Sequence, residues 1–220
     1  MRIEKNLNLL RLTYYHLKSL RFLYWVPLAV LFLLLPVLSI EHVRSTGMSE
    51  TTFLKSFMEL QRYVPFMATW WILFGLREYA EGNGKELLYV YKPGLLPDFF
   101  MIFIWYALHV TALIALYGIF LDNYWMDYLL MMVQSLVFAS ATLFLMLLCR
   151  TIAIPFLINV LYEIFCIYSN MSTLTYINML SVNRIEQIED LLLPYFPLLI
   201  FALFLAVGAN FLYRKRGILS

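Results

Sequence analysis

Charged residues are scarce in this chain, and their scarcity excludes a soluble globular fold. Asp, Glu, Lys and Arg make up 14% of the 220 residues, against about 25% in a typical soluble domain, and hydrophobic residues make up 63%. So much apolar surface exceeds what a core of this size can bury, and the mean hydropathy of +0.77 agrees. The composition predicts an all-α membrane protein that crosses the bilayer several times.

The chain also lacks the residues and the charge that several kinds of site require. A net charge of +2 gives no basic surface for nucleic acid, so we expect no nucleic-acid partner. The two cysteines, Cys149 and Cys166, match neither a disulfide framework nor a metal-ligand spacing. The three histidines, His16, His42 and His109, accompany no paired acid and no HExxH pattern. We therefore expect no catalytic residue, metal site or bound cofactor in this chain.

Long apolar runs without charge mark the predicted membrane spans. Residues 22–40 contain no charged side chain, and about 20 apolar residues at 1.5 Å each cross the hydrocarbon layer. The second span has a shorter core, 63–76, which follows a mixed polar loop with some helical character at 41–62. When that core is extended at both ends, a single membrane domain, 1–220, has six predicted spans: about 22–40, 57–79, 99–121, 128–149, 152–169 and 191–213.

Residues 1–21 precede the first span and have a basic amphipathic pattern. Their apolar side chains recur every three or four residues, which places them on one helical face; they are Ile3, Leu7, Leu10, Tyr14 and Leu17. Basic residues are scattered around the rest of this helix. The pattern favours a helix that lies in the membrane interface, in contact with lipid headgroups. The alternative is a soluble helix packed on a partner.

Lysine and arginine are distributed unequally between alternate loops, which predicts the orientation of the chain. Twelve of the sixteen lie in residues 1–21, in 77–96, at Arg150 and in the tail 214–216. The other four fall in the alternate loops: Arg44, Lys55, Arg62 and Arg184. Since loops rich in Lys and Arg stay in the cytoplasm, both termini are predicted to be cytoplasmic and 170–190 extracellular.

Three polar side chains inside the predicted spans are candidates for a substrate path or a dimer interface. Glu163 lies near the middle of span five, where a charge is costly unless it meets water or a partner. Asn159 lies one helical turn earlier and shares its face. His109 lies in span three. The alternative for Glu163 is a protonated or hydrogen-bonded side chain that only joins helices, and for His109 it is a packing residue.

The segment 77–97 is the long polar interruption on the predicted cytoplasmic side, and it reads REYAEGNGKELLYVYKPGLLP. Its GNGK sequence differs from a phosphate-binding loop, because that motif needs an upstream strand and a Ser or Thr after the lysine, where Glu86 stands here. The two glycines let the chain turn sharply after the second span. Residues 86–91 can then form a short helix across the membrane face. The alternative is an ordinary solvated loop.

The whole layout resembles the permease subunit of a type-2 ATP-binding-cassette (ABC) exporter. In that family a coupling helix between spans two and three docks on the ATPase, and acids and a glycine precede a Glu-Leu-Leu sequence. The family places its glycine three residues before that glutamate. Here Asn83 stands there with a glycine on each side, so the register of the helix stays open. The residues assigned to the coupling segment are Glu78, Glu81, Gly82, Gly84, Lys85, Glu86, Leu87, Leu88, Tyr89 and Val90.

The resemblance implies a chain without its own ATPase in a bacterial cytoplasmic membrane. Cytoplasmic ABC ATPase subunits would bind ATP and Mg²⁺, and a second permease subunit, identical or related, would complete the substrate path among the membrane lipids. The family also implies that the segment before span six, within 170–197, dips partly back into the membrane. Two rival functions stay open: a non-transporting membrane scaffold or immunity-type protein, and a membrane-embedded enzyme.

Overall fold

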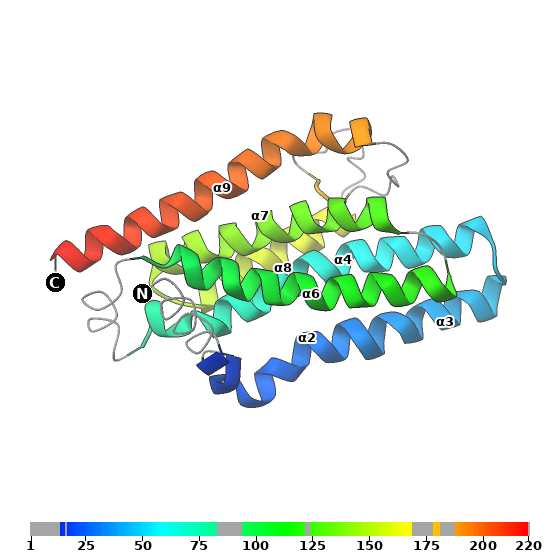
Figure 1. The fold of residues 1–220 in the computed structure, drawn as a ribbon, viewed down its shortest axis with the longest axis horizontal. Coiled ribbons are helices and arrows are strands. Elements are labelled where there is room, and N and C mark those ends of the chain that lie inside the picture. The colour runs from blue at the N-terminus through cyan, green and yellow to red at the C-terminus, as the bar shows by residue number, and fades with distance from the viewer. Residues whose placement is uncertain are drawn as a thin grey trace, which may run out of the picture.

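The computed structural model describes residues 14–15, 17–82, 94–121, 124–168, 178–180 and 188–219. Most of this part of the chain is helical and none of it is a strand, which confirms the predicted all-α class for the described residues (Figure 1). The elements, with η for short 3-10 or π turns, are η1 (Arg21–Tyr24), α2 (Trp25–Ala29), η2 (Val30–Leu34), α3 (Leu35–Thr46), α4 (Glu50–Gly75), η3 (Arg77–Tyr79), α6 (Leu96–Phe120), α7 (Trp125–Cys149), α8 (Ala153–Tyr168) and α9 (Ile188–Leu219).

Four helices in the described part of the chain are long and apolar enough to cross a membrane: Arg21–Thr46, Leu96–Phe120, Trp125–Cys149 and Tyr195–Lys215. They correspond to predicted spans one, three, four and six, and they indicate a membrane-embedded protein. The other two predicted spans correspond to α4, which has 26 residues and a more polar sequence, and to α8, which has 16 residues. That α4 and α8 also cross the membrane, giving six spans, stays a prediction.

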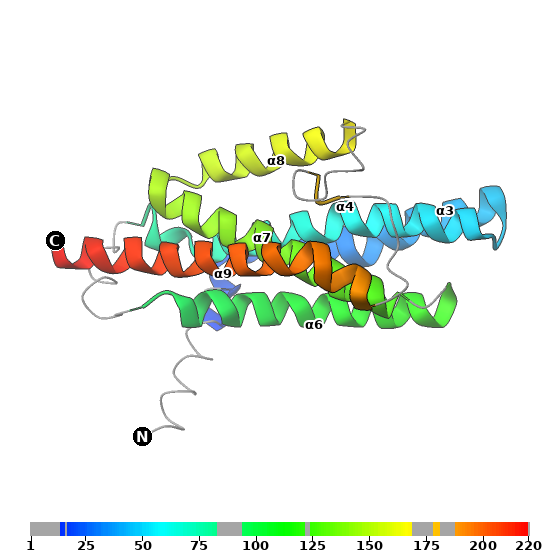
Figure 2. The same cartoon turned by 90° about the horizontal axis from the view of Figure 1, so that it is seen from above.

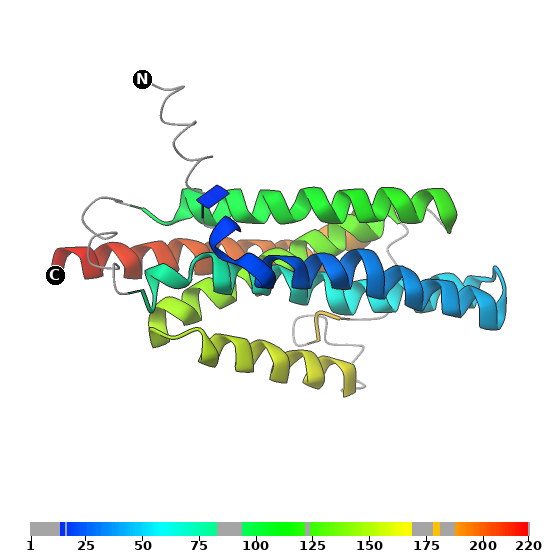
Figure 3. The same ribbon diagram turned by 90° about the horizontal axis from the view of Figure 1, so that it is seen from below.

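The helices run back and forth along one bundle. The end of α4, the start of α6, the α7–α8 turn and the end of α9 lie together at one end of it, which we call the α4–α6 end (Figures 1 and 2). The α3–α4 turn and the end of α6 lie at the opposite end, which we call the α3–α4 end. Helices α6 and α8 lie on opposite faces of the bundle (Figure 3). Helix α7 is central, because it packs against α9, α4 and α8. Of its most apolar stretch, 61% is buried, against 22–33% in the other three long apolar helices.

Two neighbouring tryptophans of α4 donate hydrogen bonds to the first pass, Arg21–Thr46, and a proline in that pass explains one of the two bonds. Pro27 has no N–H, so the carbonyl of Leu23 lacks the donor that an uninterrupted helix would supply. The indole of Trp70 donates to that carbonyl at 2.9 Å, and the indole of Trp71 donates to the carbonyl of Tyr24 at 3.2 Å. The bond to Leu23 satisfies an oxygen that Pro27 leaves without a helical donor, and both bonds join the first pass to α4.

The connection between the first two passes is shorter than predicted. The helical character expected at 41–62 is confirmed, but the extent of the expected loop is wrong, because α3 continues to Thr46 and α4 begins at Glu50. Gly47 ends α3 with a φ of 72°, which favours glycine. Ser49 caps α4 by accepting a hydrogen bond from the backbone N–H of Thr52 at 3.4 Å. The mixed composition of 41–62 concealed this stop-and-cap signal, since polar residues at helix ends resemble loop residues.

Two predicted segments lie largely outside the described residues. Of the predicted interfacial helix 1–21, the structure describes 14–15 and 17–21, where the side chains of Tyr14 and Tyr15 are exposed. Of the predicted extracellular segment 170–190, it describes 178–180 and the backbone of 188–190. The lipid contact of the first segment and the location of the second therefore stay predictions.

Candidate functional site

The structure describes the two ends of the predicted coupling segment, which we call its bases: residues 77–82 after α4 and residues 94–97 at the start of α6. Of its proposed residues, Glu78, Glu81 and Gly82 are described, together with residues 94–97 on the other side. The remaining members lie outside the described residues: Gly84, Lys85, Glu86, Leu87, Leu88, Tyr89 and Val90. The predicted helix at 86–91 is therefore untested, and the geometry of the site begins where the segment joins α4 and α6.

Glu81 joins the first base to the start of α8. Its Oε1 accepts a hydrogen bond from the backbone N–H of Ile152 at 2.8 Å, and its Oε2 lies 3.6 Å from Nε of Arg77. Ile152 immediately precedes α8, where the helix dipole and unpaired N–H groups favour an anion. The sequence predicted a coupling role for Glu81 beside Glu78; the structure brings Glu81 to α8 and leaves Glu78 exposed.

Glycine at position 82 is required by the turn that follows Glu81. A Cβ built on Gly82 would lie 2.6 Å from the backbone oxygen of Glu78 and 2.9 Å from its Cα. Both atoms belong to the backbone, so a flexible side chain cannot move away to make room. The close approach agrees with the sequence-based expectation that glycine lets the chain turn here.

The two bases are bonded to each other and to α9. The hydroxyl of Tyr79, after α4, donates to Oδ2 of Asp98, in the first turn of α6, and both side chains are buried. Burial, and then the nearby Asp98 carboxylate, raise the pKa of the Tyr79 hydroxyl above its ordinary value, so this hydroxyl stays protonated and donates. The ring of Tyr79 packs edge-on against Tyr213 of α9, with centroids 5.6 Å apart. The backbone N–H of Leu95 donates to Oδ1 of Asn210 at 3.0 Å.

A group of ionisable side chains lies along α4 and α8, away from the helix ends. Arg62 is twelve residues after Glu50 and thirteen before Gly75, so it lies about 18 Å along α4 from either end. Its NH1 lies 3.4 Å from Oε1 of Glu59, and Arg62 also attracts the carboxylate of Glu163 on α8. The side chains of Arg62 and Glu59 are 32% and 21% exposed. We call Glu59, Arg62 and Glu163 the charged group.

Two members of the charged group were missed from the sequence. Arg62 was assigned to an outer loop and Glu59 was not singled out, because the apolar core of the second span was expected to begin at residue 63. The signal that could have found them is their spacing: an acid and a base three residues apart face the same side of a helix. With α4 beginning at Glu50, that pair lies in the middle of the helix, and the charge of Arg62 acts on the predicted Glu163 of the adjoining α8.

Asn159 ties α8 to α7. Its side chain is 5% exposed, and its Nδ2 donates to Oγ1 of Thr142 at 2.7 Å. The Thr142 hydroxyl in turn donates to the carbonyl of Phe138 at 2.7 Å. Asn159 thus shares a helix with Glu163 but forms a hydrogen-bonded packing contact with α7, as buried polar side chains between helices do.

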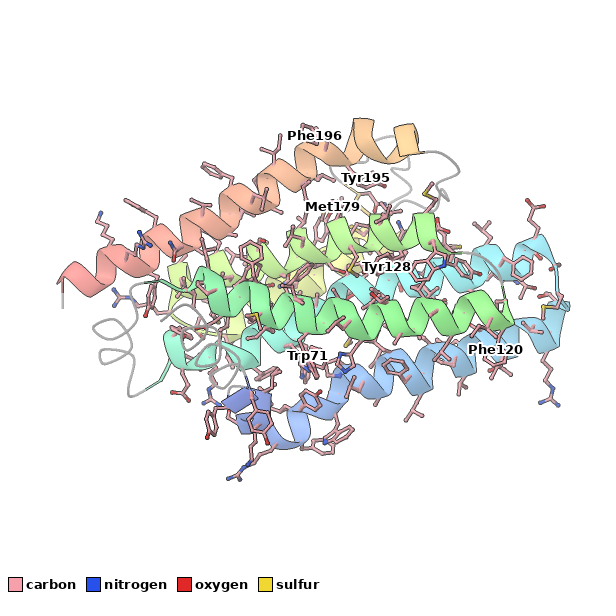
Figure 4. All side chains as sticks on the ribbon, viewed as in Figure 1. Trp71, Phe120, Tyr128, Met179, Tyr195 and Phe196 are labelled. Carbon is pink, nitrogen blue, oxygen red and sulfur yellow. The ribbon has the colours of Figure 1, made fainter. Side chains whose placement is uncertain are left out.

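His109 is part of an aromatic cluster that joins three passes. Its Nδ1 lies 2.8 Å from the carbonyl oxygen of Trp105, and its ring packs edge-on against Trp105 and Trp71 with centroids 5.0 and 5.2 Å apart. The ring of Phe32 lies 6.4 Å away in the same geometry. Trp71 lies between the first pass and α6 (Figure 4). These contacts support the packing alternative for His109, and we assign it no part in a substrate path.

Residues 178–180 are non-helical and buried inside the bundle. The side-chain amide of Gln134 donates to the carbonyl of Met179, which lies beside α7 (Figure 4). The backbone N–H of Met179 lies 3.4 Å from the hydroxyl of Tyr162, and Nδ2 of Asn178 donates to the carbonyl of Cys166 at 3.1 Å. Gln134 is nine residues, or about 14 Å, beyond the start of α7. Side chains of α7 and α8 thus satisfy irregular backbone at this depth.

Two further features of the described residues concern metal ligation and disulfide bonding. No group of three or more His, Cys, Asp or Glu side chains that could hold a metal ion occurs among them, and Cys149 and Cys166 are free thiols. Among the described residues, ionisable side chains meet in the charged group and, at the α4–α6 end, in the Arg77–Glu81 and Tyr79–Asp98 contacts. Comparison of the chain with known protein families, curated proteins and solved structures finds no match.

Proposed function

We propose that this chain is the permease subunit of an ABC exporter, working with a second permease and with separate ATPase subunits. The observation that carries the proposal is the charged group on α4 and α8. It contains Glu59, Arg62 and Glu163: Arg62 lies in the middle of α4, Glu163 lies inside predicted span five, and the side chains of Arg62 and Glu59 are partly exposed. This partial exposure distinguishes the charged group from an ion pair that only stabilises the fold, which would be expected to lie deeper in the packed core.

Contact with lipid hydrocarbon is energetically unfavourable for this face of the bundle. Placing one Arg, Lys or Asp at the centre of a span costs about 2.5–3.5 kcal/mol on insertion scales, and more in simulations. The face therefore needs water or another polar protein surface beside it. A second permease, identical or related, that presents its own α4 and α8 would supply that surface, and a substrate path would lie between the two subunits.

The bonds at the α4–α6 end support the other half of the proposal. The predicted coupling segment joins α4 and α6, and its bases are bonded to α8 through Glu81 and to α9 through Leu95. An ATPase that bound residues 83–93 would act on bases that are fixed to other helices. In this scheme the ATPase binds ATP and Mg²⁺, and the permease chain takes no part in hydrolysis.

The charge distribution and the buried segment 178–180 agree with this arrangement. Twelve of sixteen Lys and Arg residues fall on the side that carries the coupling segment, so we place six spans in a bacterial cytoplasmic membrane with both termini inside. The non-helical backbone at 178–180 fits the re-entrant segment expected before span six. The carbonyl and the N–H of Met179 have protein partners, as such a segment requires.

Co-purification tests the proposal. The tagged chain is extracted from its native membrane in mild detergent, and the eluate is assayed for an ABC ATPase subunit and for Mg²⁺-dependent ATP hydrolysis. We expect both with the wild type, and a loss of at least tenfold when residues 86–88 are changed to alanine. The matched control replaces three exposed residues at the α3–α4 end, Glu41, Arg44 and Glu50, with alanine and keeps the ATPase.

Two outcomes contradict the proposal and identify its rivals. A well-folded chain that retains no ATPase under any extraction condition would support a scaffold or immunity-type protein. An activity of the chain that persists after the ATPase is removed, and that disappears when Glu163 is changed, would support a membrane-embedded enzyme. If alanine substitution of residues 86–88 leaves ATPase retention unchanged, that result contradicts the coupling role of the segment.

A further inference from the structure

The bond between Glu81 and Ile152 crosses from the base of the predicted coupling segment to the start of another helix. We propose that Glu81 is a positioning residue that carries movement of this segment into α8, the helix that holds Glu163. The inference rests on the proposed function, because it takes the movement to come from an ATPase bound to the coupling segment. It adds a specific route by which that movement reaches the charged group.

Each oxygen of the Glu81 carboxylate has a partner. One accepts from the backbone N–H of Ile152 at 2.8 Å, and the other lies 3.6 Å from the guanidinium of Arg77. The carbonyl of Ile152 accepts from the N–H of Phe156 at 3.3 Å, so Ile152 is the residue at which the hydrogen bonding of α8 begins. A displacement of Glu81 therefore acts on the first turn of α8.

The base of the segment has little room to absorb a displacement. Gly82 lies so close to Glu78 that a Cβ would meet its backbone, and the buried hydroxyl of Tyr79 is bonded to Asp98 on the opposite base. These contacts join residues 77–82 to the start of α6. Movement imposed on the segment is therefore passed to the groups that the bases touch, and through Glu81 it reaches α8.

Helix α8 is placed to respond as a unit. It has 16 residues, and it packs against α7 and α4. Its outward face is apolar and exposed at Leu157 and Leu161, while Glu163 lies ten residues after its first residue, about 15 Å along the helix. A tilt or shift that begins at Ile152 would change the distance between Glu163 and Arg62 on α4, and thereby alter the charged group.

A second hydrogen bond at the same turn supplies a matched control. The N–H of Ala153 donates to Oγ1 of Thr151 at 3.2 Å, so this bond caps α8 with a residue of its own turn. Thr151→Ala removes one hydrogen bond from the start of α8 and leaves its connection to Glu81. Glu81→Ala removes one hydrogen bond from the same place and cuts that connection. A purely structural role for Glu81 as a helix cap predicts similar results from both variants.

The test measures the position of α8 in the complete assembly. The chain carries Cys149→Ser and Cys166→Ser, with spin labels on cysteines introduced at Tyr168 of α8 and Ile119 of α6, both exposed. Labelled chains are diluted with unlabelled chains, assembled with the co-purified ATPase in lipid nanodiscs, and measured by pulsed electron spin resonance without nucleotide and with ATP plus vanadate.

We expect the label distance in the parent protein to change when ATP and vanadate are added. Glu81→Ala should reduce that change at least threefold, while ATPase binding stays within twofold of the parent value. Thr151→Ala should keep the full change. Glu81→Gln, which retains an oxygen that can accept from Ile152, should keep at least half of it. If Glu81→Ala is not recovered from the membrane, Glu81→Ser takes its place, because a serine side chain is too short to reach Ile152.

The possible failures are distinguishable. If the parent protein retains no ATPase, the proposed function is overturned and this inference is overturned with it. If the ATPase is retained but α8 does not move in the parent, or moves as far in Glu81→Ala as in the parent, the inference alone is overturned. Equal losses in Glu81→Ala and Thr151→Ala also overturn it, since they indicate a helix cap and no transmission.

Discussion

Asn159 of α8 donates a hydrogen bond to the hydroxyl of Thr142 of α7 across 2.7 Å, and both side chains are buried. The bond joins a helix at the edge of the bundle to its central helix. Since Thr142 also donates to the carbonyl of Phe138, the two partners depend on this bond unequally. That inequality gives a specific expectation for their substitution.

Replacement of Thr142 should destabilise the fold more than replacement of Asn159. Asn159→Ala leaves the Thr142 hydroxyl with its second partner, and we expect a loss of about 1 kcal/mol, in the range measured for polar contacts between membrane helices. Thr142→Val leaves the buried amide of Asn159 without its acceptor, at a cost of about 2 kcal/mol. Reversible unfolding in bicelles measures both. Leu157→Ala, on the exposed face of α8, is the control, and the reverse order would contradict the assigned bond.

Two glycines should respond oppositely to alanine. Gly82→Ala introduces a Cβ that meets the backbone of Glu78, so we expect a lower unfolding temperature and weaker ATPase retention. Gly118→Ala meets nothing within 4 Å in α6 and replaces a poor helix former, which should stabilise the helix by about 0.5–1 kcal/mol. Thermal unfolding of the purified variants measures both changes. Equal tolerance at the two positions would contradict the close approach at residue 82.

Arg62 should be more important to stability than either of the acids beside it. Arg62→Ala leaves Glu59 and Glu163 without their common counter-charge, and we expect a loss of about 1–2 kcal/mol, less than for a fully buried pair because the group is partly exposed. Adding Glu163→Gln to Arg62→Ala should restore part of that loss. A double-mutant cycle in reversible unfolding measures the coupling, and additive effects would show that the two side chains do not interact.

The Tyr79–Asp98 bond predicts a difference in alkaline stability. A phenol whose pKa is raised on folding contributes its full stability below its unfolded value, near 10, and loses it as the pH rises above that value. Tyr79→Phe removes both the bond and this titration. The unfolding temperature of the wild type should therefore exceed that of the variant at pH 8, and the gap should narrow above pH 10. A difference in unfolding temperature that stays constant up to pH 11 would contradict the burial of the protonated Tyr79 hydroxyl.

The apolar passes were predictable from the sequence, whereas the links between them were only partly so. Residues 22–40 form an uninterrupted apolar run, and such a run identifies a span without knowledge of its neighbours. The start of α4 was missed because Glu50, Glu59 and Arg62 make the first half of that helix resemble a loop. Its capping signal, Ser49 after Gly47, is local and could have been found.

The candidate site was predictable in its residue types and not in its contacts. Gly82 was expected to allow a turn, and Glu163 was expected to be unusual, because both inferences depend on the residue and its local surroundings. The bond from Glu81 to Ile152 joins residues 71 positions apart, and no periodicity or motif reports such a distant approach. Asn159 and Glu163 share a helix, but only packing reveals that Asn159 contacts Thr142.

Electron cryo-microscopy of the assembly extracted from its native membrane tests the central proposal most directly. We expect two permease chains that face each other through α4 and α8, with Arg62 and Glu163 at their common surface, and an ATPase subunit bound at residues 83–93 of each chain. A single chain whose α4 and α8 face lipid, or an assembly with no ATPase at the α4–α6 end, would contradict it.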